Sequence, residues 1–342
     1  MKPLTHTIAA LAALCAVSCN NHLPEGTILC QESPDDTVSF SFVCELGEEI
    51  KYQSMVQKIQ FVDDTRFIAL SYSFPEPIPY IYNIDGEQLS AVGRIGRAGG
   101  EFMFPSSVAV DGGFIYLSCS QSRKILKFDL NGKFVEEYKK FKDRRADIAV
   151  TEDYIYLYNT NDHNVELYDR AQREIVGYIG EFEEAAKALH SWSATKPMCE
   201  YGEGVLYVDP VTLTVNRVVG EQSEQLFILS APNYSVDRDV NFRDLMSGPE
   251  YAKMQEYSKR NSTVHYVAVS GEKLYIVVHH GDTRISALIS VDMSSRTATY
   301  RPIADPRNEN CIISSYHLHS NTLYALMKNM DNDMQFVAKL NL

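Results

Sequence analysis

The sequence lacks the short motifs of the common enzyme classes. It contains no His-Glu-x-x-His zinc motif, no Gly-x-Ser-x-Gly nucleophile turn and no phosphate-binding P-loop. It has no Cys-x-x-Cys pair, and its cysteines are scattered without metal-ligand spacing. Basic residues are outnumbered by acidic ones, 32 to 45, and they form no stripe with interleaved aromatic residues. The sequence therefore predicts no nucleic-acid partner, no metal and no cofactor.

Long apolar runs are also absent, except for one run at the start of the chain. Residues 8–17 follow the basic Lys2 and are too few to span a bilayer as a helix. Small residues at 16–18 then precede Cys19, and this arrangement resembles a bacterial lipoprotein signal. The resemblance implies cleavage before Cys19 and lipid attachment to that residue. An ordinary secretory signal is the alternative, because position 16 is Ala where lipoprotein signals more often have Leu.

This reading divides the chain into three parts. Residues 1–18 are expected to be the lipoprotein signal peptide, 19–36 a polar, proline-containing tether, and 37–342 the folded domain. The lipid would make the membrane a partner and would place the protein at the outer membrane. The residues that follow Cys19 are not acidic, which favours the periplasmic side over the cell surface.

Five cysteines lie beyond Cys19, and an odd number cannot all pair within one chain. We expect buried free thiols. An extracytoplasmic compartment would permit a disulfide, and Cys30 with Cys44 is the first pair to test.

The most informative stretch of the sequence is residues 93–138. A glycine-rich turn is followed there by four runs with strand composition, and glycine-containing turns at 111–113 and 131–132 separate them. The runs are 107–110, 114–118, 125–129 and 134–138. These runs predict a four-stranded antiparallel meander, which needs neighbours because one sheet cannot bury both of its faces.

Weaker copies of this unit recur along the chain. Five of six predicted second strands carry Tyr at the third position, and the units repeat every 40 to 50 residues or so, as propeller blades do. The last unit is one strand short, whereas the isolated run 37–46 has no neighbouring partner. We therefore predict an all-β, six-bladed β-propeller whose last blade is closed by residues 37–46. A helical insertion is expected near 240–260.

The glycine-rich turn makes a family resemblance visible. Gly93, Gly96, Arg97, Gly99-Gly100-Glu101-Phe102 and Pro105, with the three strands that follow, resemble an NHL repeat. The whole chain with its signal resembles the six-bladed β-propeller lipoproteins of the NHL or TolB-like type found in gut-type anaerobic bacteria. That resemblance implies a fold and a location in the cell envelope, but no particular reaction.

Ligands of propellers usually bind along the axis, near the starts of the innermost strands. Ser107, Asp147, Lys196, His265 and Tyr316 occupy such starts, and Arg94 and Arg97 could reach the same funnel from the glycine turn. The candidate ligand-binding residues are Arg94, Arg97, Asp147, Lys196, His265 and Tyr316. Solvation of the channel is the simpler explanation for this polar set.

We favour a non-enzymatic binding module that presents one face to a glycan, a peptide or an envelope protein. The alternative is a metal-dependent, lactonase-like hydrolase or lyase that would use Asp147 and His265 in the funnel. No catalytic residue can be assigned from the sequence.

Overall fold

The computed structural model describes most of the chain beyond residue 22. The described residues are 23–33, 36–46, 56–71, 77–119, 121–138, 141, 147–158, 163–192, 196–247, 252–281 and 285–342. Cys19 and the predicted signal peptide lie outside these ranges.

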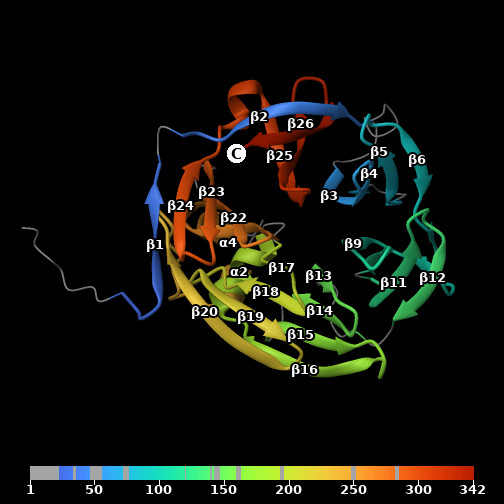
Figure 1. The fold of residues 1–342 in the computed structure, drawn as a ribbon, viewed down its shortest axis with the longest axis horizontal. Coiled ribbons are helices and arrows are strands. Elements are labelled where there is room, and N and C mark those ends of the chain that lie inside the picture. Colours follow the sequence, from blue (N-terminus) through green and yellow to red (C-terminus); the bar gives the residue numbers. More distant parts are fainter. Residues whose placement is uncertain are drawn as a thin grey trace, which may run out of the picture.

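Six four-stranded antiparallel blades surround a central axis, as Figure 1 shows in a view along that axis. From the axis outward, the first three blades are β3 (Val56–Asp63), β4 (Arg66–Ser71), β5 (Tyr80–Asn83) and β6 (Gln88–Ala91); β9 (Pro105–Asp111), β10 (Phe114–Cys119), β11 (Lys124–Asp129) and β12 (Phe134–Tyr138); and β13 (Asp147–Val150), β14 (Tyr154–Tyr158), β15 (His163–Asp169) and β16 (Glu174–Glu181). The next two are β17 (Met198–Tyr201), β18 (Gly204–Val208), β19 (Thr214–Val219) and β20 (Gln222–Ser230); and β21 (Ser262–Ser270), β22 (Lys273–His280), β23 (Ile285–Asp292) and β24 (Thr297–Pro302). The six-bladed propeller predicted from the repeats is confirmed.

The sixth blade joins the two ends of the propeller. It consists of β25 (Cys311–His319), β26 (Thr322–Asn329), β27 (Gln335–Asn341) and, as its outer strand, β2 (Ser39–Glu45). Strand β2 runs antiparallel to β27, with Ser39 opposite Asn341 and Glu45 opposite Phe336. The predicted closure of the last blade by residues 37–46 is therefore correct.

Apolar side chains fill every space between neighbouring blades. Six separate clusters of buried residues lie between blades 1 and 2, 2 and 3, 3 and 4, 4 and 5, 5 and 6, and 6 and 1. Each second strand is buried on both faces, as in Ile115-Tyr116-Leu117, because it packs against a blade on either side. The core of this protein is thus a ring of interfaces.

The repeated tyrosine of the second strands forms hydrogen bonds between one blade and the next. The Tyr116 hydroxyl of blade 2 accepts a hydrogen bond of 2.9 Å from Arg170 of blade 3. The Tyr156 hydroxyl of blade 3 likewise accepts from the backbone N–H of Gly220 in blade 4, at 3.1 Å. A buried phenol combines a large apolar ring with a polar tip, so it suits a position that crosses an interface and ends at a hydrogen-bonding group.

The glycine-rich turn connects blade 1 to blade 2 through a short ladder of β7 (Arg94–Ile95) and β8 (Glu101–Phe102). Gly93 has a φ of 68°, and a Cβ atom there would lie 2.7 Å from the Phe128 ring. Only glycine fits this close crossing between blades, in agreement with the prediction of a structural turn.

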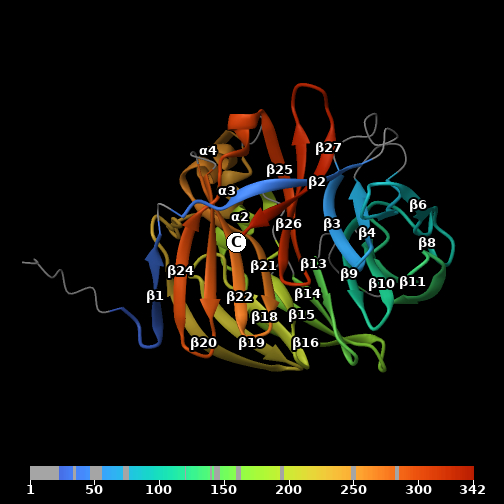
Figure 2. The ribbon, with the colours of Figure 1, turned by 45° about the horizontal axis from the view of Figure 1, so that its top comes forward.

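Strand β1 (Thr27–Glu32) forms within the segment that the sequence analysis assigned to a tether. It runs parallel to both neighbours and pairs first with β20 and then with β24, so that blades 4 and 5 form one nine-stranded sheet. Figures 1 and 2 show β1 between these two outer strands. Residues 27–32 are therefore part of the fold, because alternate side chains of this short run, Ile28 and Cys30, are buried against blades 4 and 5.

Three helices lie at one end of blades 3 and 4, and the first of them in the chain packs against both blades. α3 (Phe242–Leu245) and α4 (Ala252–Arg260) occupy the predicted insertion, whereas α2 (Glu184–Trp192) was not predicted. Ala188 and Leu189 of α2 pack against Met254 and Tyr257 of α4. Because α4 ends just before the inner strand β21, the helices lie at the end of the propeller where the inner strands begin (Figure 2). None of the helices in the described ranges is long and apolar enough to cross a membrane.

The five cysteines beyond Cys19 are all free and buried, so Cys30 and Cys44 form no disulfide. Burial raises the pKa of the Cys30 thiol to about 12, which keeps it protonated and unreactive.

We predict that β1 stabilises the propeller through its inward-facing side chains. Ile28→Asp should lower the free energy of unfolding by about 3 kcal/mol, because it places a carboxylate in the apolar interface between blades 4 and 5. Leu29→Asp is the matched control, since Leu29 is 60% exposed. Its effect should stay within about 0.5 kcal/mol. Urea unfolding of the two variants measures the difference, and equal effects would show that β1 is dispensable.

Candidate functional site: the entrance of the central channel

Four of the six predicted ligand-binding residues meet at the axis. Asp147, Lys196, His265 and Tyr316 line one cavity of about 30 Å³, which is room for one or two water molecules. Lys58 from the inner strand of blade 1 completes this group, and Ser107 of blade 2 reaches it by a hydrogen bond to Asp147. Each of the six blades thus contributes at least one polar side chain to the channel entrance.

Irregularities in the inner strands direct several of these side chains toward the channel. The ladder between the first and second strands shifts register near the entrance in four blades. In blade 5 the shift leaves His265 unpaired between Val264 and Tyr266, and in blade 6 it leaves Ser314 unpaired between Ile313 and Ser315. A β-bulge turns a side chain away from the regular alternation, and bulges are frequent beside functional sites.

Asp147 is the electrostatic centre of the entrance and is only 3% exposed. Its Oδ1 accepts hydrogen bonds from the Lys58 ammonium, at 3.0 Å, and from the Ser107 hydroxyl. Burial alone would raise the pKa of Asp147, but the charges of Lys58 and Lys196 and these hydrogen bonds hold it below its ordinary value. Asp147 is therefore a carboxylate at neutral pH.

Lys196 begins the inner edge of blade 4. Its backbone forms an isolated parallel bridge with Tyr266 of blade 5, in which the Lys196 N–H donates a hydrogen bond to the His265 carbonyl oxygen. Burial disfavours its cation, but the negative charges of Glu200 and Asp147 outweigh this effect and raise the pKa of Lys196. The channel therefore holds two ammonium groups and two carboxylates, namely Lys58, Lys196, Asp147 and Glu200, and its fixed charges balance.

Several buried polar atoms at the entrance have no hydrogen-bond partner among the described residues. They are Asp147 Oδ2, His265 Nδ1, Ser314 Oγ and Ser315 Oγ, which line the cavity, and two atoms of blade 5 behind it, Nε2 of His279, whose ring contacts His265, and Oγ1 of Thr263, which pairs with His279. Leaving a buried polar atom unpaired costs roughly 1–3 kcal/mol, so such atoms occur in a cluster only where another group satisfies them. This set contains hydroxyl donors, a carboxylate acceptor and imidazole nitrogens.

Three buried histidines around the channel are neutral. The His265 and His279 rings lie 4.3 Å apart between centroids, and the Tyr316 ring meets His265 edge-on at 5.7 Å. Burial, together with His279, holds the pKa of His265 well below its ordinary value, and burial, together with His280, lowers the pKa of His279 to about 4. Burial also lowers the pKa of His317 well below its ordinary value.

Below the entrance the channel widens into a space of about 260 Å³. Three residues line both spaces and form the boundary between them, namely Lys196, Tyr266 and His317.

The rings of His317 and His319 both stack on Phe61, so the two side chains share a face of β25, as residues two apart in a strand do. His319 Nε2 lies 2.9 Å from Asp64. In the described ranges, no three His, Cys, Asp or Glu side chains are grouped as metal ligands.

The two arginines of the glycine turn do not reach the channel. Arg94 is 76% exposed and pairs with Glu101 at 2.8 Å, while Arg97 lines a separate hollow beside blade 2. The short ladder of β7 and β8 directs this turn away from the axis. Lys58 was missed, although its place is the blade 1 equivalent of the five inner-strand residues singled out from the other blades. The alignment of the repeats was the signal that could have found it.

Comparison with known proteins agrees with this architecture. The family DUF5128, described as a 6-bladed beta-propeller, matches residues 39–289. The chain belongs to this family. None of the curated proteins matches the chain in sequence.

Two solved structures similar to this DUF5128 propeller come from Bacteroides species. A protein of Bacteroides fragilis, described as a candidate exported protein, has a TM-score of 0.68 at 13% identity, covering 92% of this chain and 99% of its own. A member of the DUF4221 family from Bacteroides vulgatus has a TM-score of 0.60 at 10% identity, covering 89% and 98%. At these identities the likeness concerns the fold alone.

We predict that acid destabilises this propeller through its channel histidines. His279 is neutral in the folded chain down to about pH 4, whereas an unfolded chain takes up the proton near its ordinary pKa of 6.5. The stabilisation is therefore complete above about pH 6.5 and is lost as the pH falls toward 4, by up to about 1.4 kcal/mol per pH unit for each histidine. Urea unfolding at pH 7.5 and pH 5.0 measures the loss.

His279→Gln should flatten this dependence on pH, because it removes one of the groups that titrate on unfolding. His163→Gln is the control on an exposed part of β15. If the two variants keep the same slope between pH 7.5 and pH 5.0, His279 does not contribute.

Proposed function

We propose that this DUF5128 protein is an exported, non-enzymatic binding module that holds a polar group of a saccharide at its channel entrance. The observation that carries the proposal is the cluster of buried, unpartnered polar atoms contributed by inner strands of different blades. A ligand that enters the channel satisfies them and gains the full value of hydrogen bonds formed away from water.

The charges and atom types favour an uncharged, hydroxyl-rich ligand. Lys58 already pairs with Asp147, and Lys196 is balanced by Glu200 and Asp147, so a charged ligand would leave one charge uncompensated. The open positions include both donors and acceptors, and a sugar hydroxyl can act as either. The entrance cavity of about 30 Å³ admits a small group only, so the ligand is the end of a glycan rather than its middle. A peptide or an envelope protein are the other partner classes to test.

The location of the protein in the cell is part of the same proposal. The signal at residues 8–19 supports lipid attachment at Cys19, and the similar Bacteroides fragilis structure is described as a candidate exported protein. We place the protein as a lipoprotein at the outer membrane, facing the periplasm, and regard it as NHL- or TolB-like in type. A metal-dependent hydrolase or lyase stays the alternative, and elemental analysis of the purified protein tests it.

Ser315→Ala tests ligand binding at the entrance. The Ser315 hydroxyl is buried and unpartnered, so its removal should leave the melting temperature unchanged while it weakens saccharide binding by about three- to tenfold. A glycan array with the purified chain selects the saccharide, and calorimetric titration gives the affinity.

Ser223→Ala on the exposed outer strand β20 is the matched control and should bind like the original chain. The proposal fails if no saccharide binds, or if the bound saccharide has the same affinity for both serine variants. Binding of a peptide in its place, weakened by Ser315→Ala, would keep the site and change the ligand class.

A further inference from the structure

A second hollow, separate from the channel, lies beside blade 2. Its volume is about 560 Å³, within the range of small-molecule sites, and it forms where the glycine turn meets the loop between β10 and β11. Pro105 at the start of β9 pairs with Cys119 at the end of β10, so this loop lies at the same end of the propeller as the channel entrance. None of the channel-lining residues lines this hollow.

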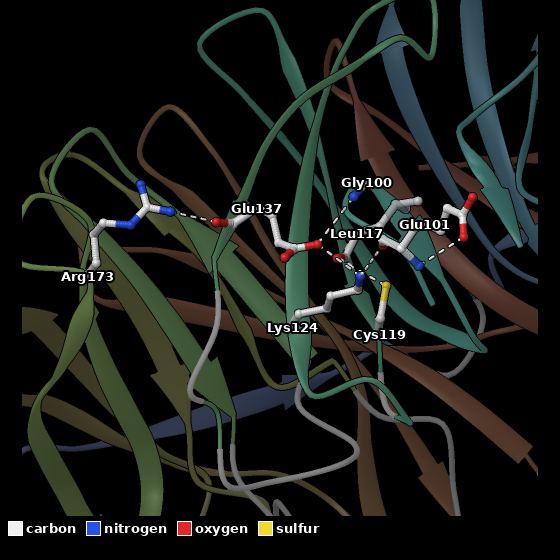
Figure 3. Close-up of polar contacts among 8 residues, drawn as sticks. Gly100, Glu101, Leu117, Cys119, Lys124, Glu137 and Arg173 are labelled. Carbon is white, nitrogen blue, oxygen red and sulfur yellow. Dashed lines mark hydrogen bonds and ion pairs between the residues drawn. The ribbon is translucent and has the colours of Figure 1, made fainter. Parts of the chain in front are cut away.

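A buried ion pair beneath the hollow holds its two sides together. Lys124 donates hydrogen bonds of 2.9 Å to Glu137 and of 3.3 Å to the backbone oxygen of Ala98, and Gly100 N–H donates to the same Glu137 oxygen at 3.3 Å. Figure 3 shows the Lys124 ammonium pointing at the Glu137 carboxylate, with the glycine turn on one side and Arg173 on the other. The side chains of Lys124 and Glu137 are only 7% and 10% exposed. Their charges cancel, so this pair adds no net charge to the hollow.

Two other cations remain uncompensated. Arg97 and Arg123 both line the hollow and are exposed, and neither guanidinium makes an ion pair or hydrogen bond with any described residue. Other arginines of this part of the chain do have carboxylate partners, Arg94 with Glu101 and Arg173 with Glu136. In a protein with a net charge of -13, two free guanidinium groups around one hollow make a local positive site.

The walls offer contacts of other kinds. Met103 and Phe141 provide apolar surface, and Gln121 and Ser122 provide polar groups. The Ser122 hydroxyl is enclosed and has no hydrogen-bond partner among the described residues. Gly99 leaves the hollow open, because a Cβ atom there would meet nothing within 4 Å. An arginine pair beside an apolar wall matches a small molecule that carries an oxyanion on a carbon skeleton.

We propose that this hollow is a binding site for the oxyanion, a carboxylate or a sulfate, of a small acidic molecule such as an acidic sugar. The oxyanion contacts Arg97 and Arg123, and the carbon skeleton covers Met103 and Phe141. This site is independent of the proposed saccharide site in the channel, because it has its own lining residues and prefers the opposite kind of ligand.

Calorimetric titration of the purified full chain with glucuronic acid, glucose 6-sulfate, inorganic sulfate and glucose tests the proposal. The two acidic sugars should bind, and their affinity should fall as salt rises because the arginines are exposed. Glucose should not bind at this site. Equal affinity for inorganic sulfate would assign the site to the anion alone, and tighter binding of the acidic sugars would assign it to the whole molecule. Both results support an oxyanion site.

Three variants locate the binding. Arg97→Gln and Arg123→Gln should each weaken binding of the acidic sugars about tenfold or more, because each removes a charge-assisted hydrogen-bond donor. Gly99→Trp should abolish binding by filling the hollow without a change of charge. Arg243→Gln is the control, since it removes an exposed arginine of α3 and should leave the affinity within twofold.

The proposal is overturned if none of the acidic probes binds. It is also overturned if they bind with the same affinity to the original chain, Arg97→Gln and Gly99→Trp. Ser315→Ala separates the two sites, because it should weaken binding in the channel and leave binding of the acidic probes unchanged.

Discussion

Every blade of this protein depends on two neighbours, because a four-stranded sheet with apolar residues on both faces cannot be stable alone in water. The apolar clusters lie between blades, one at each of the six interfaces, and no single blade contains a core of its own. The pairing of β2 with β27 supplies the last of these interfaces with its outer strand. Ring closure is thus the condition on which the burial of all six clusters rests.

The same closure creates the channel and determines its chemistry. Inner strands converge on the axis, and polar side chains on them that point to the axis have no solvent to face except the narrow channel. Pairing Lys58 with Asp147 across the channel compensates the cost of burying both charges, whereas several hydroxyl and imidazole atoms nearby have no partner in the part of the chain that the structure describes. A structure that only needed to close its ring would be more stable with small apolar residues at these places, which supports a role for them in binding.

The sequence predicts the fold well and the site in part. Strand alternation, turn residues and the repeated tyrosine are local signals with a regular spacing, so they reveal the blades and the closing strand. Asp147, Lys196, His265 and Tyr316 could be placed at the axis because the repeats align them. Arg94 and Arg97 were misplaced because the direction of the glycine turn depends on the β7–β8 ladder, which has too few residues for a pattern. Strand β1 and the bulges at His265 and Ser314 depend on contacts with distant strands, which no local pattern records.

Strands β1 and β2 have a consequence for how the chain folds. Most strand pairs join neighbours in sequence and can form as soon as a hairpin has been made, but β2 pairs with residues about 300 positions later. Strands β1 and β2, which are synthesised first, therefore cannot pair until the strands of blades 4 to 6 have formed. Until then the incomplete ring exposes an unpaired strand edge. Closure of so long a loop is slow and comes late. A chain that has not closed presents that open edge to other chains, so the stage most exposed to aggregation is the one before closure, while the sixth blade still lacks β2.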